Sequence, residues 1–176
     1  MAAFGAATRD AVDIGCGAGI ETAAILASGW RVVAIDAEAD GIARVLARMS
    51  PDELPRLRVE IGGIEEVAVP EADLVWAGYS LFFVAPERFP TVWQRIREAV
   101  RPGGRFAGQL LGERDTWAAD DEVNAHSRLE AERLLDGWSI ERFEEEENDG
   151  EALSGPKHWH LFHVVARAPD ASERAL

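Results

Sequence analysis

A glycine-rich turn between a short apolar strand and a helix most constrains how this chain can fold. Residues 11–14 predict a buried strand, and residues 21–26 predict a helix that begins directly after the turn. Gly15, Gly17 and Gly19 remove three Cβ atoms where the backbone must bend sharply and a ligand must come close. A turn of this kind, at the carboxyl end of the first strand, is where open α/β sheets bind nucleotides.

The spacing of the glycines and two acids indicates which nucleotide. A dinucleotide fingerprint needs a sixth-position glycine, but Ile20 stands there, which disfavours a nicotinamide-dependent reductase. Asp13 lies two residues before the first glycine, where an amino-acid ammonium group could be reached. A second predicted strand, 31–36, ends in Asp36, which is placed to hydrogen-bond ribose hydroxyls. An adenosyl group with an amino-acid tail fits both acids.

Residues 12–19 and 33–36 resemble the class I S-adenosylmethionine-dependent methyltransferases. Residues 101–109 and 157–167 are similar to a bacterial branch of methyltransferase-domain or tellurite-resistance-like proteins. The resemblance extends from about residue 11 to residue 167. It implies an α/β fold with a Rossmann-like sheet of seven mostly parallel strands, an antiparallel last strand and helices on both faces. We therefore expect a single domain over residues 1–176, with its core at about 11–168.

The resemblance also implies the residues that bind S-adenosyl-L-methionine, whose product is S-adenosyl-L-homocysteine. Asp13 and Gly15 should lie at the methionine end, Asp36 at the ribose and Ala37 against the adenine. Many relatives place an acid at the position of Gly63, so here Ile64 or Glu65 must meet the adenine amine. The full expected set is Asp13, Gly15, Cys16, Gly17, Gly19, Asp36, Ala37, Ile64 and Ala77.

The rest of the pattern alternates strands and helices and ends in a hairpin. This order predicts parallel strands joined by helical crossovers, whose carboxyl ends share one edge of the sheet. An antiparallel last strand would bring residues 157–160 to the same edge. The expected helices are 38–49, 91–100 and 126–136; the expected strands are 57–61, 72–77, 105–111, 138–146 and 157–168; turns are expected at 102–104 and 148–150.

The residues expected at this edge of the sheet include the candidates for catalysis. Methyl transfer is an in-line displacement that mainly needs alignment, and a base is needed only when the acceptor is protonated. Tyr79, His158 and His160 are the catalytic candidates, while Trp117 and Trp159 are expected to line the acceptor pocket. Period-two alternation turns His163 to the opposite strand face, so we expect no metal site. The acidic run 144–147 is either a solvated strand end or a feature that favours cationic substrates.

Composition limits the partners. The net charge of −14 disfavours nucleic acid and anionic membranes, and the apolar stretch 74–85 is too short to span a bilayer. The single cysteine, Cys16, excludes a disulfide framework and is expected to pack under the turn. The first residues contain no cationic segment followed by an apolar run, so a cytoplasmic location is expected.

Residues 1–9 are small and irregular, and we expect a loose lead-in without the helices that usually cover the cofactor in relatives. A second subunit of a homodimer is one way to supply that cover. The favoured function is an S-adenosylmethionine-dependent methyltransferase (EC 2.1.1.-) acting on a small molecule. The alternative is an S-adenosylmethionine-binding protein of the same fold with weak or no transferase activity. The acceptor atom does not follow from the sequence.

Overall fold

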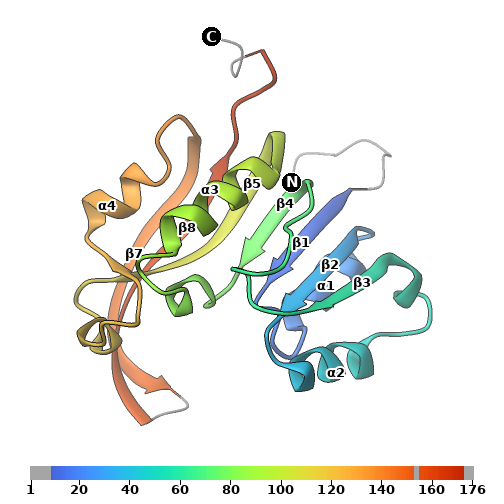
Figure 1. The fold of residues 1–176 in the computed structure, drawn as a ribbon, viewed down its shortest axis with the longest axis horizontal. Helices are drawn as coiled ribbons and strands as arrows, with labels where there is room; N and C mark the ends of the chain where they lie inside the picture. Colours follow the sequence, from blue (N-terminus) through green and yellow to red (C-terminus); the bar gives the residue numbers. More distant parts are fainter. Residues whose placement is uncertain (1–8, 153–154, 173–176) are drawn as a thin grey trace.

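A computed structural model describes residues 9–152 and 155–172, which form one mixed sheet with helices on both faces (Figure 1). The main path of the sheet has the order β3-β2-β1-β4-β5-β8-β7, and a short strand, β6, pairs with β5. The strands are β1 (Asp10–Ile14), β2 (Arg31–Asp36), β3 (Leu57–Ile61), β4 (Ala72–Ala77), β5 (Val100–Gly112), β6 (Ala125–His126), β7 (Ser139–Ala152) and β8 (Gly155–Arg167). The lead-in expected over residues 1–9 lies outside the described residues apart from Arg9.

The strand directions confirm the predicted sheet. Strands β1 to β5 pair in parallel, whereas β8 is antiparallel to both β5 and β7. The register pairs Ile14 with Ile35 and Ala77 with Gly108, so the carboxyl ends of β1, β2 and β4 meet at one edge. Ligands of open α/β sheets bind beyond this edge.

The two faces of the sheet are covered by different helices. The helices α1 (Ile20–Ala27) and α2 (Ala39–Arg48) bury Leu26 and Val45 against β1 and β2. On the other face, α3 (Phe89–Ala99) and the short α4 (Arg128–Arg133) pack against β4, β5 and β8, with Ile96 and Phe162 fully buried. Single 3₁₀ turns occur at η1 (Leu54–Arg56), η2 (Leu81–Phe83) and η3 (Thr116–Ala119). No helix within the described ranges is long and apolar enough to cross a membrane.

Three local predictions are wrong. The turn expected at 102–104 lies within β5, where Gly103 takes a φ of 71°. The turn expected at 148–150 is paired strand, with Asn148 opposite Trp159 and Gly150 opposite Lys157. The ladder with β8 outweighs the local turn preference there, because residues 142–152 pair one by one with residues 155–165.

The helix expected over 126–136 is also shorter than predicted. Ala125 and His126 form β6 against the end of β5, and α4 begins only after Ser127. The Ser127 side chain accepts the Glu130 N–H while the Glu130 carboxylate accepts the Ser127 N–H, which is a capping box. This cap fixes the start of the helix two residues later than the sequence pattern indicated.

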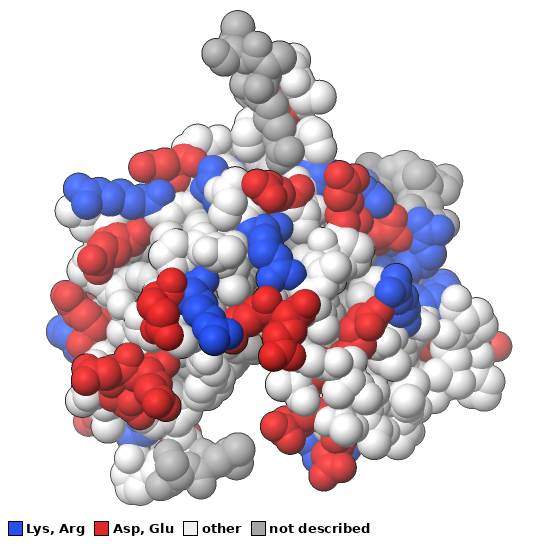
Figure 2. All heavy atoms as spheres, in the orientation of Figure 1, with Lys and Arg blue, Asp and Glu red and all other residues white. Residues whose placement is uncertain are grey.

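The surface is notched at the carboxyl edge of the sheet. Figure 2 shows this notch at the lower edge of the molecule, between the surface of the β7–β8 hairpin and the surface over α2. Acidic side chains gather on both sides of it, as expected for a chain with a net charge of −14. A ligand that enters from this side therefore meets a negative field.

Candidate functional site

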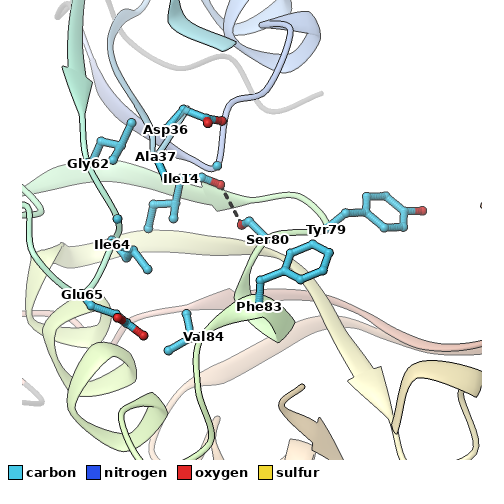
Figure 3. Close-up of a pocket in the computed structure, with 13 residues that line it drawn as sticks. Ile14, Asp36, Ala37, Gly62, Ile64, Glu65, Tyr79, Ser80, Phe83 and Val84 are labelled. Atoms are coloured by element: carbon cyan, nitrogen blue, oxygen red, sulfur yellow. Dashed lines mark hydrogen bonds between the residues drawn. The ribbon is translucent and has the colours of Figure 1, made fainter. Parts of the chain in front are cut away.

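A cavity of about 360 Å³ lies beyond the carboxyl ends of β1, β2 and β4. Figure 3 shows Ile64 and Glu65 on one side, Ser80, Phe83 and Val84 on the other, and Tyr79 extending away from them. Its size falls in the range of small-molecule sites. It is lined by Ile14, Gly15, Ile35, Asp36, Ala37, Gly62, Gly63, Ile64, Glu65, Tyr79, Ser80, Phe83 and Val84.

The glycine turn forms one wall because it is fastened to two neighbouring strands. The backbone N–H groups of Gly15 and Cys16 both donate to the Ile35 carbonyl, at 2.8 and 3.0 Å. From the other side, the Ser80 hydroxyl donates to the Ile14 carbonyl at 2.7 Å. Gly15 has a φ of 68°, and a Cβ there would lie 2.4 Å from the Ser80 Cβ. Only glycine therefore allows the turn to lie against the end of β4.

Asp36, at the end of β2, is held in place by the backbone. Its Oδ2 accepts the Gly17 N–H at 2.7 Å, and its Oδ1 accepts the Glu38 N–H at 2.8 Å. Gly41 leaves space for the Asp36 carboxylate, since a Cβ at this position would lie 3.2 Å from it. A carboxylate has about four acceptor positions, so the two oxygens can still accept hydroxyl groups of a ligand.

Asp13 does not line the cavity. It is 1% exposed, and its Oδ2 accepts the Thr22 hydroxyl at 2.5 Å. Burial raises the pKa of Asp13 to about 6, while the hydrogen bonds from Thr22 oppose that rise. The carboxylate therefore ties β1 to the first turn of α1, directly beneath the glycine turn.

The nine residues expected to bind the cofactor divide into two groups. Gly15, Asp36, Ala37 and Ile64 line the cavity. Cys16 is buried within the turn, and burial raises the pKa of its thiol to about 12, which disfavours the reactive thiolate. The four remaining residues, which are not part of the lining, are Asp13, Gly17, Gly19 and Ala77.

The wall opposite the glycine turn is fastened to α3. Arg95 donates to the carbonyls of Ile64 and Glu65, at 3.1 and 3.0 Å. The Glu65 side chain pairs with Arg88 at 3.0 Å, just before α3 begins. Ile64 and Glu65, the residues expected to replace the acid missing at Gly63, are thus both at the cavity.

Tyr79 alone among the three catalytic candidates lines the cavity. It is the one described non-glycine residue with a positive φ, 54°, a conformation that costs roughly 1–2 kcal/mol. Its N–H donates to the Gln109 side chain at 3.2 Å, and its side chain is 48% exposed. Strain of this kind persists where surrounding structure holds it, and it clusters at functional sites.

The two histidine candidates lie in a separate polar network. His160 is fully buried; its Nδ1 accepts the Arg114 N–H at 3.1 Å, and its Nε2 lies 3.0 Å from Glu145. His158 lies beside Asp149 and Glu147, and hydrogen bonds to these acids raise its pKa. Neither histidine lines the cavity, so the structure does not bring them together with Tyr79.

Part of this network has the composition of a metal site. Ligand atoms of Glu145, Glu147 and His160 lie within 4.8 Å of one another. However, the Arg114 guanidinium donates to both carboxylates, each at 2.7 Å in its shortest contact. Arg128 also pairs with Glu145, at 2.8 Å. Since the two arginines together balance the two acids, the cluster forms an ion-pair network.

The sequence interpretation missed Phe83 and Val84, which line the cavity from η2 and the residue after it. Phe83 is 63% exposed, unusual for a large apolar side chain. Both residues lie in the apolar stretch 74–85, beyond the end of the strand expected at 72–77. The sequence feature that could have indicated them is the pair Phe82–Phe83, two aromatic residues in the connection that follows a parallel strand.

Comparison with known proteins agrees with this geometry. A family model described as a methyltransferase domain matches residues 11–104, which include the glycine turn, Asp36 and the β4–α3 connection. Trans-aconitate 2-methyltransferase from Deinococcus radiodurans is 33% identical over 104 residues, which are 59% of this chain and 38% of that protein. The chain thus spans about two fifths of that relative's length.

Two solved structures share the fold. TehB from Haemophilus influenzae has a TM-score of 0.75 at 16% identity, over 92% of this chain and 58% of that one. The N-methyltransferase NodS from Bradyrhizobium japonicum, in complex with S-adenosyl-L-homocysteine, has a TM-score of 0.70 at 17% identity, over 93% and 80%. At these identities the likeness is one of fold.

Proposed function

The chain belongs to the methyltransferase-domain family, and we propose that it binds S-adenosylmethionine in the cavity and transfers the methyl group to a small-molecule acceptor. The observation that carries the proposal is that Asp36 and the glycine turn line one cavity of about 360 Å³. The net charge of −14 also favours a small acceptor over a nucleic acid.

The residues present fit the adenosyl group. Asp36 is fixed by two backbone N–H groups yet keeps acceptor positions for ribose hydroxyls. Ala37 and Ile64 offer apolar contacts for adenine, and Gly15 lets the backbone come close to the methionine end. Asp13 acts indirectly, because its bond to Thr22 holds α1 under the turn.

When bound, S-adenosylmethionine supplies a methyl group on a sulfonium: an acceptor lone pair forms the new bond to carbon while the carbon–sulfur electron pair passes to sulfur. The chain itself aligns the two partners and excludes water. Phe83 and Val84 provide an apolar wall, and Tyr79 is held at the mouth by its bond to Gln109. Orientation in a dry site can supply several kcal/mol of the barrier.

Calorimetric titration with S-adenosylmethionine and S-adenosylhomocysteine, followed by an acceptor screen that measures S-adenosylhomocysteine release, tests the proposal. We expect saturable binding of both compounds and turnover with at least one acceptor. Absence of heat and of a thermal shift with either compound would contradict the proposed cofactor. Tight binding without turnover across a broad panel would instead support a cofactor-binding protein without transferase activity.

A further inference from the structure

Four aromatic side chains form a continuous wall at the mouth of the cavity. We call Tyr79, Phe83, Trp117 and Trp159 the aromatic wall. The Tyr79 ring lies 6.2 Å from the Trp159 ring, Trp159 lies 5.5 Å from Trp117, and Trp117 lies 5.8 Å from Phe83. Tyr79 and Phe83 line the cavity and are 48% and 63% exposed. The wall thus runs from the cavity to the start of β8 and presents ring surface to an incoming molecule.

A buried ion pair holds the wall in place. The Lys157 ammonium lies 3.8 Å from the centre of the Trp159 ring and 4.3 Å from that of Trp117. It pairs with Asp115, and both side chains are almost completely buried. Asp115 also accepts the Trp117 backbone N–H at 2.9 Å, so one carboxylate fixes both the cation and the backbone of a tryptophan in the middle of the wall. The wall is therefore a preformed surface.

The charges around the wall favour a cation. Among the described residues, the cavity lining contains two acids, Asp36 and Glu65, of which Glu65 pairs with Arg88 outside the lining, and no lysine, arginine or histidine. Burial is the largest cause that raises the pKa of Tyr79, and the negative charges of Glu146 and Glu21 raise it further. Both carboxylates therefore act at the wall. Lys157 is neutralised by Asp115 and cannot attract an external anion. The acidic side chains on both sides of the notch extend this field outward (Figure 2).

We propose that the aromatic wall selects an arylalkyl amine, a flat apolar ring carrying a basic nitrogen, as the acceptor molecule, and rejects the corresponding carboxylates. The amine binds as its ammonium and releases a proton to solvent before the nitrogen lone pair forms the bond to the methyl carbon. Rings of this kind stack on aromatic side chains, and ammonium groups are attracted both to ring faces and to the surrounding acids. An anion would meet the Asp36 and Glu65 carboxylates and no cationic side chain among the described residues that line the cavity. The inference rests on the proposed function, because the wall borders the cofactor cavity.

The test uses pairs of probes that differ in charge but not in shape. Phenethylamine and 3-phenylpropionate, and tryptamine and indole-3-propionate, are titrated calorimetrically into the protein saturated with S-adenosylhomocysteine. We expect each amine to bind at least tenfold more tightly than its carboxylate partner, and the preference to shrink as salt is added. Equal affinities, a preference for the carboxylates, or no binding of any probe at millimolar concentration would overturn the inference.

Two variants separate the roles of ring and charge. Phe83→Ala should weaken amine binding about tenfold, whereas Leu129→Ala, which truncates a similarly exposed apolar side chain on α4, should not. Glu146→Gln should reduce the amine-to-carboxylate ratio, and Glu71→Gln, an exposed acid at the amino end of β4, should leave it unchanged. Unaltered amine affinity in Phe83→Ala, or an unaltered amine-to-carboxylate ratio in Glu146→Gln, would contradict the assignment.

The cofactor titration keeps the two proposals distinguishable. If S-adenosylhomocysteine fails to bind, the proposed function is wrong. If it binds and the probe pairs show no amine preference, only the acceptor inference is wrong.

Discussion

The Asp36 carboxylate accepts the backbone N–H of Gly17 at 2.7 Å, so the end of β2 directly holds the turn that follows β1. The same side chain accepts the Glu38 N–H at 2.8 Å, at the start of α2. One acid therefore sets the distance between the glycine turn and the start of the second helix. Its charge serves both the fold of the turn and the ribose contact that we propose.

The substitution Asp36→Asn is expected to weaken S-adenosylhomocysteine binding at least tenfold. The amide replaces one acceptor oxygen by an N–H₂ donor, which would face either the Gly17 or the Glu38 N–H. Calorimetry measures the loss, with Asp52→Asn as the control because Asp52 is an exposed acid after α2. Equal affinities of Asp36→Asn and Asp52→Asn for S-adenosylhomocysteine would show that Asp36 makes no contact that contributes to binding.

Gly15→Ala and Gly17→Ala form a matched pair. Both residues have positive φ, 68° and 52°, so each alanine costs about 1–2 kcal/mol of backbone strain. A Cβ at Gly15 would also lie 2.4 Å from the Ser80 Cβ, whereas one at Gly17 would meet nothing within 4 Å. Gly15→Ala should therefore lower the unfolding temperature more than Gly17→Ala and abolish the thermal shift caused by S-adenosylhomocysteine. Identical behaviour of both variants would refute the close approach of β1 and β4.

The buried Asp13 predicts a pH dependence of stability. Burial raises its pKa in the folded protein to about 6, from an ordinary value of 3.8. Between these values the folded chain holds a proton that the unfolded chain releases, so this group contributes less stability as the pH rises. Asp13→Asn lacks this dependence and can still accept the Thr22 hydroxyl.

We therefore expect the unfolding free energy of Asp13→Asn, relative to the original chain, to increase by about 1 kcal/mol between pH 5 and pH 7.5. Urea unfolding at the two pH values measures this difference. Parallel pH profiles of the two proteins would mean that Asp13 titrates as an ordinary carboxyl group.

The Lys157–Asp115 pair should be sensitive to the loss of one partner. Lys157→Met leaves the Asp115 carboxylate buried without its cation and should destabilise the protein by about 3 kcal/mol. The double variant Lys157→Met, Asp115→Asn removes the unpaired charge and should recover part of that loss. Chemical denaturation measures both, and a double variant no more stable than Lys157→Met would contradict the pairing.

The parts of the fold that sequence could predict are those fixed by local chemistry. Gly15 and the strand ending at Ile14 predict a turn at the sheet edge, since only a residue without a Cβ fits there. The position of Asp36 at the same edge could also be predicted, because its distance along the chain from the turn matches one strand–helix–strand unit. The parallel order of β1 to β5 then follows from the alternation of strands and helices.

The parts that sequence could not predict depend on contacts between distant segments. Asn148 and Gly150 favour a turn locally, but pairing with Trp159 and Lys157 keeps them in the ladder. His160 lies at the predicted edge, yet its side chain is enclosed by Arg114 and Glu145. Such burial is decided by tertiary packing, about which residue type and spacing carry no information.

The aromatic wall also depends on tertiary packing, which is why the sequence did not predict it. Trp117 and Trp159 were expected to line a pocket, but their contact with each other through Lys157 joins segments about forty residues apart in the chain. Phe83 completes the wall from a third segment. No local pattern predicts which of the six tryptophans meet.

The central claim is that the cavity beside Asp36 holds the adenosyl group, and a crystal structure of the protein grown with S-adenosylhomocysteine tests it most directly. The account predicts ribose hydroxyls within hydrogen-bond distance of the Asp36 carboxylate and adenine between Ala37 and Ile64. Adenosyl density elsewhere, or a cavity closed by the side chains of Phe83 and Ile64 in the presence of saturating ligand, would contradict it.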